Sequence, residues 1–337
     1  MAHSKGFLQL AAETDRQFAD ARATWDAIRP SAAEHAARIR ESGRLVLLGM
    51  GGSHWINRAA EPHYRAAGID ATAHVLSEYM RAPLPVADAV RIVTSQSGAS
   101  GEAVRYLQGR DNAIWTIGMT LDPASPLARG THAMVGAGGV EIAYAATRSL
   151  LVTLAMHAVL LDALGLDMSG FRAVLDNPAE ADTGDAEDLI AGSQNAVLVA
   201  RGAMQGVADA AALSFMELAR IPVLGLEAGQ FRHGPFEMID GETAVIFLRG
   251  AGDEGDNIDG LSRECSDAGV RPVVFDFSGE TAIAGAITVR LPAVHGLAAA
   301  ATVLPVLQRA IIAASDRMVP DVGMPIRSRK VTSGEAA

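Results

Sequence analysis

The stretch Leu45-Val46-Leu47-Leu48-Gly49-Met50-Gly51-Gly52-Ser53 decides the fold, because an apolar run meets a glycine-rich turn and then a helical pattern. An uninterrupted apolar run of this length is typical of a strand that is buried on both faces. A second such unit, Ala196-Val197-Leu198-Val199 followed by Arg201-Gly202, begins 196 − 45 = 151 positions later. The sequence therefore predicts an internal duplication.

Further short apolar runs follow each of these two units and alternate with helical patterns. This alternation is typical of a parallel sheet with helices on both faces. We therefore expect an α/β protein with two tandem, doubly wound, flavodoxin-like domains. The additional runs lie at residues 72–76, 90–94, 113–118 and 133–135, and then at 222–224, 244–248, 273–275 and 287–289.

The predicted domain boundaries follow changes in composition. Apolar residues recur at helical spacing from the N-terminus, and Pro30 is expected to break that helix. A polar, Asp-rich stretch indicates a connector between the domains, and an Ala-rich helix from about Val294 to Ala314 closes the second one. The predicted parts are an N-terminal helical segment at 1–43, a first domain at 44–166, a connector at 167–190, a second domain at 191–319 and a C-terminal tail at 320–337.

Composition excludes several classes of protein. The chain has 337 residues, of which 49% are hydrophobic and 20% charged, as in a globular protein. A net charge of -11 argues against binding to nucleic acids or anionic membranes. The single Cys265 allows no internal disulfide, and no signal-peptide pattern opens the chain, so we expect a cytoplasmic protein. The apolar stretch 149–166 contains His157 and Asp162 and is short for a membrane span, which favours a buried helix.

The first predicted domain contains a candidate anion-binding loop. The strand at 90–94 leads into Thr94-Ser95-Gln96-Ser97-Gly98-Ala99-Ser100, which precedes a helical pattern. Backbone N–H groups at a helix start carry partial positive charge, and serine hydroxyls add donors. Such a loop can hold a phosphate without Lys or Arg. A simple helix cap is the local alternative, because serine is favoured at that position.

Three motifs in order, Gly51-Gly52-Ser53, Ser95 to Ser100 and Gln230-Phe231-Arg232-His233-Gly234-Pro235, resemble the sugar isomerase (SIS) family. The chain looks most like the isomerase half of glutamine-fructose-6-phosphate aminotransferase and the free-standing phosphosugar isomerases, aminosugar-phosphate deaminases and fructosamine-phosphate deglycases. The resemblance runs roughly from Leu45 to Thr332. It implies a phosphate bound by Ser95, Gln96, Ser97 and Ser100, with Gly52 and Ser53 closing over the sugar.

Glu217 and His233 are the candidate acid–base residues. Glu217 lies on a predicted helix over 207–220 with an apolar edge, which favours a raised pKa and a general base. A solvated helix glutamate is the local alternative. In the family the catalytic Glu precedes the His of the His-Gly-Pro motif by sixteen positions, and here 233 − 217 = 16. The resemblance implies that His233 opens the sugar ring and is contributed by a neighbouring subunit, so we expect a homodimer.

Lys330 is the third candidate catalytic residue. It ends Pro325-Ile326-Arg327-Ser328-Arg329-Lys330, which resembles the family's C-terminal segment that folds back over the substrate. The resemblance implies either a Schiff base with the open-chain ketose, which needs the neutral amine, or electrostatic clamping of the substrate. A solvated basic tail is the alternative.

The sequence also departs from the family pattern. The segment Glu141 to Arg148 resembles Glu-Ile-x-Val-Ala-Ser-Thr-Lys, but Ala146 replaces the substrate-contacting Ser and Arg148 replaces the Lys. Gly52 stands where the aminotransferases carry Thr. These changes leave the identity of the sugar substrate undecided. No glutamine-hydrolysing domain precedes Met1, so we do not expect glucosamine phosphate to be made from glutamine.

The resemblance implies a metal-free enzyme that acts on a hexose 6-phosphate with nitrogen at C1 or C2. Glucosamine-6-phosphate deaminase is the leading case, followed by fructosamine-phosphate deglycase and plain aldose–ketose isomerisation. A non-catalytic sugar-phosphate regulator is the alternative from another class. No cofactor is expected, because the Gly49-x-Gly51-Gly52 stretch falls short of the dinucleotide fingerprint and the nine His residues lack zinc-ligand spacing.

Overall fold

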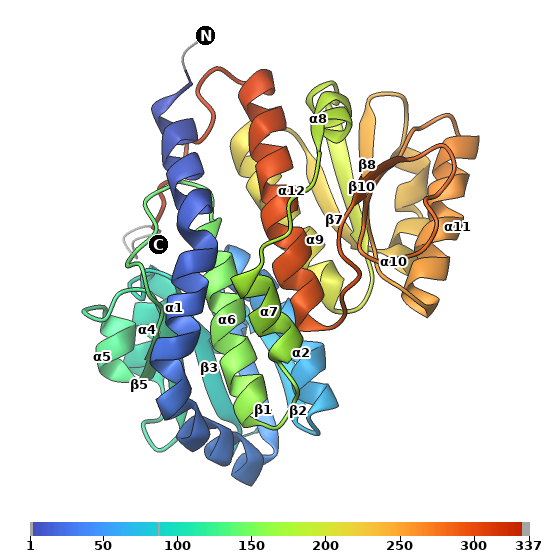
Figure 1. Ribbon diagram of the computed structural model, residues 1–337. Helices are drawn as coiled ribbons and strands as arrows, with labels where there is room; N and C mark the ends of the chain where they lie inside the picture. The colour runs from blue at the N-terminus through green and yellow to red at the C-terminus, as the bar shows by residue number, and fades with distance from the viewer. Residues whose placement is uncertain (1–2, 87, 332–337) are drawn as a thin grey trace. The chain divides into compact units, whose positions relative to one another are not determined.

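The computed structural model describes residues 3–86 and 88–331, and the chain forms two compact units (Figure 1). The first-sheet unit comprises Glu13–Asp176 and the tail from Pro325 onward. The second-sheet unit comprises the N-terminal segment up to Ala12 and Asn177–Met324. Each unit holds one five-stranded parallel sheet, which confirms the predicted α/β class with two sheets. Parts of the predicted terminal segments, residues 1–2 and 332–337, lie outside the described residues.

The first sheet has the strand order β2-β1-β3-β4-β5. Its strands are β1 (Arg44–Gly49), β2 (Asp70–Val75), β3 (Val90–Thr94), β4 (Thr116–Thr120) and β5 (His132–Val135). The helices that belong to this unit wholly or in their greater part are α1 (Lys5–Ser42), α2 (Gly51–Ala66), α3 (Leu76–Arg81), α4 (Gly101–Gly109), α5 (Pro126–Gly130), α6 (Arg148–Ala163) and α7 (Ser169–Asp176).

The second sheet, traced from β7, has the order β7-β6-β8-β9-β10 and so repeats the topology of the first. The duplication that the apolar runs predict is therefore present in the fold. The strands are β6 (Asn195–Ala200), β7 (Val223–Glu227), β8 (Thr243–Arg249), β9 (Val273–Asp276) and β10 (Ile287–Arg290). The helices are α8 (Gly184–Ala191), α9 (Ala203–Ala219), α10 (Ala228–Arg232), the 3-10 helix η1 (Pro235–Met238), α11 (Asp253–Asp267) and α12 (Leu297–Met318).

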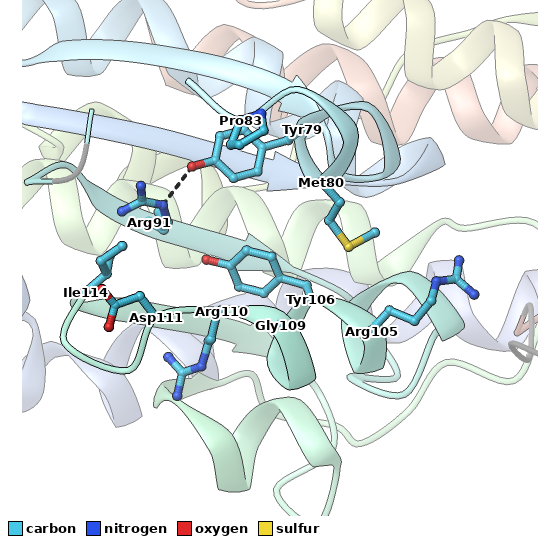
Figure 2. Close-up of a pocket in the computed structure, with 10 residues that line it drawn as sticks. All are labelled: Tyr79, Met80, Pro83, Arg91, Arg105, Tyr106, Gly109, Arg110, Asp111 and Ile114. Carbon is cyan, nitrogen blue, oxygen red and sulfur yellow. Dashed lines mark hydrogen bonds between the residues drawn. The ribbon is translucent and has the colours of Figure 1, made fainter. Parts of the chain in front are cut away.

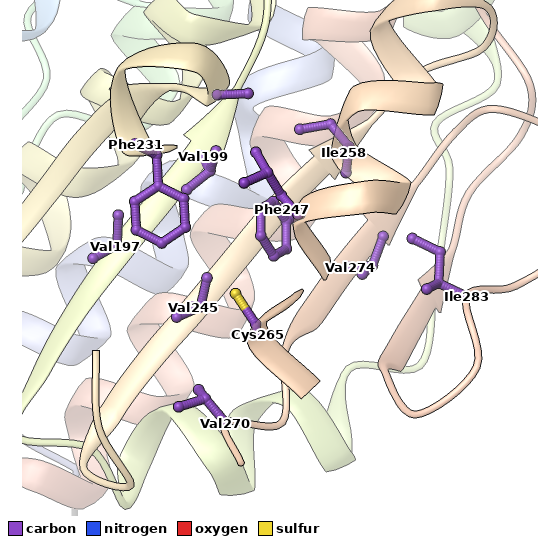
Figure 3. Packing of buried hydrophobic residues seen from close by; sticks show 12 residues of the cluster. Val197, Val199, Phe231, Val245, Phe247, Ile258, Cys265, Val270, Val274 and Ile283 are labelled. Carbon is purple, nitrogen blue, oxygen red and sulfur yellow. The ribbon is translucent and has the colours of Figure 1, made fainter. Parts of the chain in front are cut away.

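The central strands are apolar because helices cover both faces of each sheet. Every residue of β3 and β8 is buried, and β1 is exposed only at Arg44. In the second-sheet unit Phe231 of α10 packs against Val197 and Phe247 of the sheet (Figure 3). Cys265 of α11 lies in the same core, and burial, together with the nearby Glu264 carboxylate, raises its pKa to about 12. This thiol is a packing residue and not a nucleophile.

The predicted break at Pro30 is wrong, because α1 continues through that residue. Proline has no N–H to donate to the preceding turn. The Ser31 hydroxyl donates to the Ile28 carbonyl at 2.9 Å, a local bond just after the proline. Trp25 and Ile39, on either side of Pro30, are both buried. Packing of the apolar face therefore outweighs the missing hydrogen bond, and Figure 1 shows that the helix changes direction in its C-terminal part.

Two apolar helices are core elements of their units. All residues of α6 from Arg148 to Leu161 are buried, as the sequence predicts for 149–166. Among the described residues, α12 is the one helix whose length and composition would also suit a membrane span. However, 89% of its most apolar window is buried inside the fold. It packs against α8 and α9.

Candidate active site

The two predicted substrate loops of the first-sheet unit follow neighbouring strand ends. Strands β1 and β3 are parallel neighbours, and Gly49 at the end of β1 lies opposite Thr94 at the end of β3. The next strand after β1 in the chain, β2, lies on the other side of β1, so the strand order reverses here. Ligands in open α/β sheets bind at such a switch point, outside the carboxyl ends of the strands. The stretches Gly49 to Ser53 and Ser95 to Ser100 both begin there.

Gly98 fixes the shape of the serine loop. Its φ of +58° belongs to the left-handed region that favours glycine. A Cβ at this position would lie 2.2 Å from Ser125 Oγ and 2.8 Å from Thr120 Oγ1. The Gly98 carbonyl also accepts a hydrogen bond from the Leu127 N–H at 3.1 Å. The loop is therefore held against the start of α5 before any ligand binds.

The loop hydroxyls accept hydrogen bonds as caps, and their own O–H groups can still donate. Ser100 is the N-cap of α4, and its hydroxyl accepts from the Ala103 N–H at 3.4 Å. The Ser97 hydroxyl accepts from the Ala99 N–H at 3.3 Å. A hydroxyl that accepts one bond still has its own O–H to donate. Cap and anion site, the two alternatives at this turn, are therefore compatible.

Gln96 joins the serine loop to the segment around Glu141. Its side-chain carbonyl accepts from the Glu141 N–H at 3.1 Å. Its backbone carbonyl accepts from the Leu121 N–H and from the Thr120 hydroxyl. With the side-chain oxygen occupied, the amide NH₂ of Gln96 is the group left to donate to a ligand.

Gly52 and Ala146 lie beside each other, although the sequence separates them by 94 positions (146 − 52). A Cβ at Gly52 would lie 3.6 Å from the Ala146 Cβ and 3.0 Å from Leu150 Cδ2. Both are positions at which this sequence departs from the family pattern. The missing Thr and Ser hydroxyls would thus lie side by side. The half-buried Ser53 follows on the first turn of α2.

Glu141 is buried and receives Lys330 from the tail. One carboxylate oxygen accepts from the Thr147 N–H and hydroxyl at 2.8 and 2.7 Å, and the other accepts from the Ser149 hydroxyl. The Lys330 Nζ lies 3.4 Å from this second oxygen. Burial by itself would raise the pKa of Glu141, but the Lys330 ammonium and these donors lower it below its usual value. Tyr144 and Ser328 add a second side-chain contact between loop and tail.

Arg148 is a structural residue in this chain. It is fully buried, and its Nε donates to Glu13 Oε2 at 2.5 Å while Nη1 lies 3.2 Å from Asp20 Oδ2. Its Nη2 donates to the Gly139 carbonyl at 2.8 Å. All these partners belong to the first-sheet unit. The Lys-to-Arg departure therefore anchors α1 and the loop after β5.

A buried polar network that the sequence did not reveal supports the end of β3, where the serine loop begins. The Thr94 hydroxyl donates to Asn57 Oδ1 at 2.9 Å, and His157 Nε2 lies 3.1 Å from the same oxygen. His157 Nδ1 lies 2.9 Å from the Tyr64 hydroxyl. Because Asn57 Oδ1 only accepts, the network assigns the proton to Nε2 and the acceptor role to Nδ1. Burial, together with His63, lowers the pKa of His157 to about 3, so the ring is neutral.

Glu217 and His233 belong to the second-sheet unit. Glu217 is half-buried in the last turn of α9, which ends at the left-handed Arg220 (φ +62°). The Arg220 guanidinium donates to Asp321 Oδ1 at 2.8 Å and to the Met324 carbonyl at 2.9 Å. His233 is exposed just after α10, and its N–H donates to the Gln230 carbonyl. The predicted acid–base residues are therefore carried by one unit, and the predicted phosphate loop and Lys330 by the other.

The second sheet has no counterpart of the serine loop at the end of β8. Arg249 ends this strand as Thr94 ends β3, and its side chain is buried. Asp259, Asp276 and Glu280 bind the guanidinium at 2.6, 3.0 and 3.1 Å. These carboxylates already neutralise the strand end. Among the described residues, no group of three His, Cys, Asp or Glu side chains could hold a metal ion, and we assign none.

Comparison with known proteins identifies the fold. Residues 189–314 match the family model of the SIS domain. This segment of the second-sheet unit is therefore an SIS domain. A curated relative, the glutamine-fructose-6-phosphate aminotransferase 1 of Arabidopsis thaliana, is 27% identical over 240 residues, or 65% of this chain and 36% of that protein. The chain thus spans well under half the length of this relative.

Solved structures agree with the SIS chain over most of its length. The C-terminal domain of glucosamine-fructose-6-phosphate aminotransferase from Francisella tularensis has a TM-score of 0.81 at 17% identity and covers 92% of this chain and 96% of its own. Tagatose-6-phosphate ketose/aldose isomerase from Escherichia coli has a TM-score of 0.79 at 19% identity and covers 94% of this chain and 95% of its own. Glucosamine-6-phosphate deaminase from Thermotoga maritima has a TM-score of 0.72 at 16% identity and covers 96% of this chain and 99% of its own. The resemblance to the SIS family is therefore confirmed, and at these identities the structural matches show the fold alone.

Proposed function

We propose that this SIS protein is a phosphosugar isomerase of the deaminase type, with glucosamine 6-phosphate as its leading substrate. The observation that supports the proposal is the closed serine loop at the switch point of the first sheet. Gly98 fixes the conformation of this loop, which offers hydroxyl and amide groups as donors. In the hydrogen bonds described, its serine hydroxyls bind backbone N–H groups and no carboxylate. Named proteins of similar fold act on hexose 6-phosphates.

In this proposal the phosphate is a handle that positions the reacting carbons. His233 assists ring opening to the aldehyde form. Glu217 takes the proton from C2, which gives an enolamine, and returns it to C1. The resulting imine at C2 adds water, and its C–N bond breaks to leave fructose 6-phosphate and ammonia. No oxidant or reductant is needed, since C1 is reduced as C2 is oxidised.

Lys330 has the role of an electrostatic clamp in this proposal. Its Nζ lies 3.4 Å from the buried Glu141 carboxylate and forms an ion pair with it. A Schiff base would need the neutral amine. The working unit in this proposal is a cytoplasmic homodimer in which His233 serves the active site of the partner subunit. The exposed position of His233 is compatible with that use.

The test is incubation of the purified protein with glucosamine 6-phosphate, fructose 6-phosphate and a phosphorylated fructosamine, with assays for ammonia and sugar products. We expect ammonia and fructose 6-phosphate from the first substrate, and loss of most turnover in Glu217→Gln. Amine release from the third substrate alone would favour the deglycase. Conversion of fructose 6-phosphate alone would favour plain isomerisation.

The phosphate loop is tested by Ser97→Asp, which places a negative charge where the phosphate would bind. We expect the KM of this variant to rise strongly, while Ser169→Asp, an added charge at an exposed serine, leaves it unchanged. Unchanged KM in Ser97→Asp would contradict the assignment. Saturable binding of sugar phosphate to wild-type protein without any turnover would instead indicate a regulator.

A further inference from the structure

A pocket of about 300 Å³ lies near the amino-terminal ends of β3 and β4 (Figure 2). The serine loop lies at the carboxyl end of β3. The walls of the pocket come from α3, the C-terminal end of α4 and the segments that lead into β3 and β4. Arg91, at its base, is the second residue of β3, whereas Ser95 follows the last residue. Four strand residues at about 3.3 Å each separate the two positions by roughly 13 Å. A ligand in this pocket is therefore distinct from one held by the serine loop.

Arg91 is a buried cation with neutral partners. The side chain is 5% exposed. Its Nε donates to the Tyr79 hydroxyl at 2.8 Å, as Figure 2 shows, while Nη1 and Nη2 donate to the Ala89 and Val86 carbonyls at 2.8 and 3.1 Å. A guanidinium has five N–H groups, so two remain. Among the described residues no carboxylate pairs with it, and a buried charge normally has such a partner.

Tyr106 and Arg110 add to the positive character of the same pocket. Arg91, Tyr106 and Arg110 all line the pocket. Figure 2 shows the Tyr106 hydroxyl pointing to the side of the pocket where Arg91 lies, and the Arg110 side chain directed away from Arg91. Arg110 donates to the Gly130 carbonyl, so it is held in place by another neutral acceptor.

The remaining charges do not cancel this excess. Arg105, at the other end of the pocket, lies 3.7 Å from Glu102, and both are accessible to solvent. Asp111 is exposed, and its carboxylate accepts from the Ala113 N–H at 2.8 Å. Among the described residues, Arg91 and Arg110 therefore line the pocket without a carboxylate partner, and the Asp111 carboxylate beside them is solvated. In a chain of net charge -11, such a local excess of positive charge calls for an explanation.

The pocket also has an apolar surface that inorganic phosphate would not use. The Tyr79 and Tyr106 rings are almost completely buried and form part of the wall, and Met80, Pro83 and Ile114 extend it. Aromatic rings favour stacking with flat rings of a ligand. A second pocket of about 260 Å³ shares Arg110 and Ile114 with the first. Together they provide room for more than an oxyanion.

We infer that this Arg91–Arg110 pocket is a second ligand site, which binds a small organic anion that combines a phosphate with a flat ring, as in a nucleoside monophosphate. The phosphate would bind at Arg91, with Arg110 adding a second positive charge to the pocket, and the ring would lie on the tyrosine wall. This inference does not depend on the proposed deaminase reaction, because it concerns binding alone.

The test measures binding of AMP, inorganic phosphate and adenosine by isothermal titration calorimetry. The full chain is used with Ser97→Asp, so that binding to the serine loop does not contribute. We expect AMP to bind more tightly than either of its parts. Because a charge-assisted hydrogen bond contributes about 1.5–3 kcal/mol, Arg110→Gln should weaken AMP roughly tenfold or more. Tyr106→Phe, which removes only a hydroxyl from the wall, serves as a second variant if Arg110→Gln disturbs the fold.

Arg44→Gln is the matched control, because Arg44 lies at the same edge of the same sheet but outside the pocket and is already near Asp70 and Asp88. It should leave AMP binding unchanged. The inference fails if AMP does not bind saturably, or if phosphate alone binds as tightly as AMP. It also fails if Arg110→Gln and Arg44→Gln have the same effect.

Discussion

Gly98 is the residue on which the serine loop most depends, and its substitution gives a direct test. In Gly98→Ala the new methyl group meets two strains at once: a left-handed φ and contact with Ser125 Oγ, which is itself fixed by its bond to the Asp122 carbonyl. The backbone conformation costs about 1–2 kcal/mol and overpacking about 1–3 kcal/mol. We expect the free energy of unfolding, measured in urea, to fall by about 3 kcal/mol.

Gly43→Ala is the matched control for Gly98→Ala. Gly43 also has a positive φ, +66°, but a Cβ there meets nothing within 4 Å. This variant should lose only the backbone part, about 1–2 kcal/mol. Equal losses in the two variants would show that the contact with Ser125 does not constrain the loop.

His157 predicts how stability changes with pH. Burial lowers its pKa from 6.5 to about 3, and burial likewise lowers that of His54 to about 4. In the unfolded chain both rings take up a proton as the pH falls through 6.5, whereas the folded chain resists it. Stability is therefore complete above about pH 6.5 and falls toward acid, by about 1.4 kcal/mol per pH unit for each histidine.

The histidine contribution is isolated with two variants, studied by urea unfolding between pH 7 and pH 4.5. His157→Gln removes the uptake of one proton on unfolding, so it should reduce the loss of stability by about 1.4 kcal/mol per pH unit. Tyr64→Phe removes the hydroxyl that binds Nδ1 but keeps the imidazole, so it should lower stability while retaining the wild-type pH slope. An unchanged slope in His157→Gln would mean that the buried ring does not stay neutral.

At the residue scale, sequence reasoning found local features and missed long-range ones. The serine loop is one continuous stretch whose residue types predict its chemistry. The Thr94–Asn57–His157 network joins residues up to 100 positions apart, and nothing in their local sequence indicates that they meet. Arg91 is similar, because a single arginine in an apolar strand does not show which carbonyl groups will surround it. Such contacts follow from the packing of whole elements.

Among the elements, the C-terminal tail gives the clearest prediction. The segment from Pro325 is held to the loop after β5 by Lys330 on Glu141 and Ser328 on Tyr144. Lys330→Gln removes the charge that meets the buried carboxylate. We expect faster hydrogen–deuterium exchange in residues 325–331 and lower turnover. Arg329→Gln, a change at the exposed neighbour, should leave exchange unchanged. Equal exchange in the two variants would show that Glu141 does not hold the tail.

Element prediction from sequence succeeds where a strand is apolar on both faces, as in β1, β3, β6 and β8. It fails where tertiary packing or a side-chain cap intervenes. The expected run at 113–118 becomes β4 at Thr116–Thr120, because Asp111 accepts from the Ala113 N–H and forms a turn there. The expected polar connector contains α7 and α8, whose few apolar residues are buried in their units. The break expected at Pro30 fails for the same reason.

At the scale of the whole molecule, duplication gave two sheets of one topology but different strand ends. The first sheet has the serine loop after β3, whereas Arg249 and its carboxylate partners occupy the end of β8 in the second sheet. Of the two strand ends, one therefore carries the candidate phosphate loop, while the candidate Glu217 and His233 lie in the other unit. This distribution of candidate residues fits the proposed homodimer, in which each active site includes His233 of the partner subunit.

Mixing two inactive variants tests the proposed exchange of His233 between subunits. Glu217→Gln removes the base and His233→Asn removes the ring-opening imidazole, so each homodimer should be inactive. If His233 serves the partner's site, a mixed dimer of the two variants has one site with both residues intact and one with neither. Random reassortment of equal amounts gives half mixed dimers, so about a quarter of wild-type turnover should return in a twofold-symmetric assembly. If both residues act within one chain, every site lacks one of them, and mixing restores nothing.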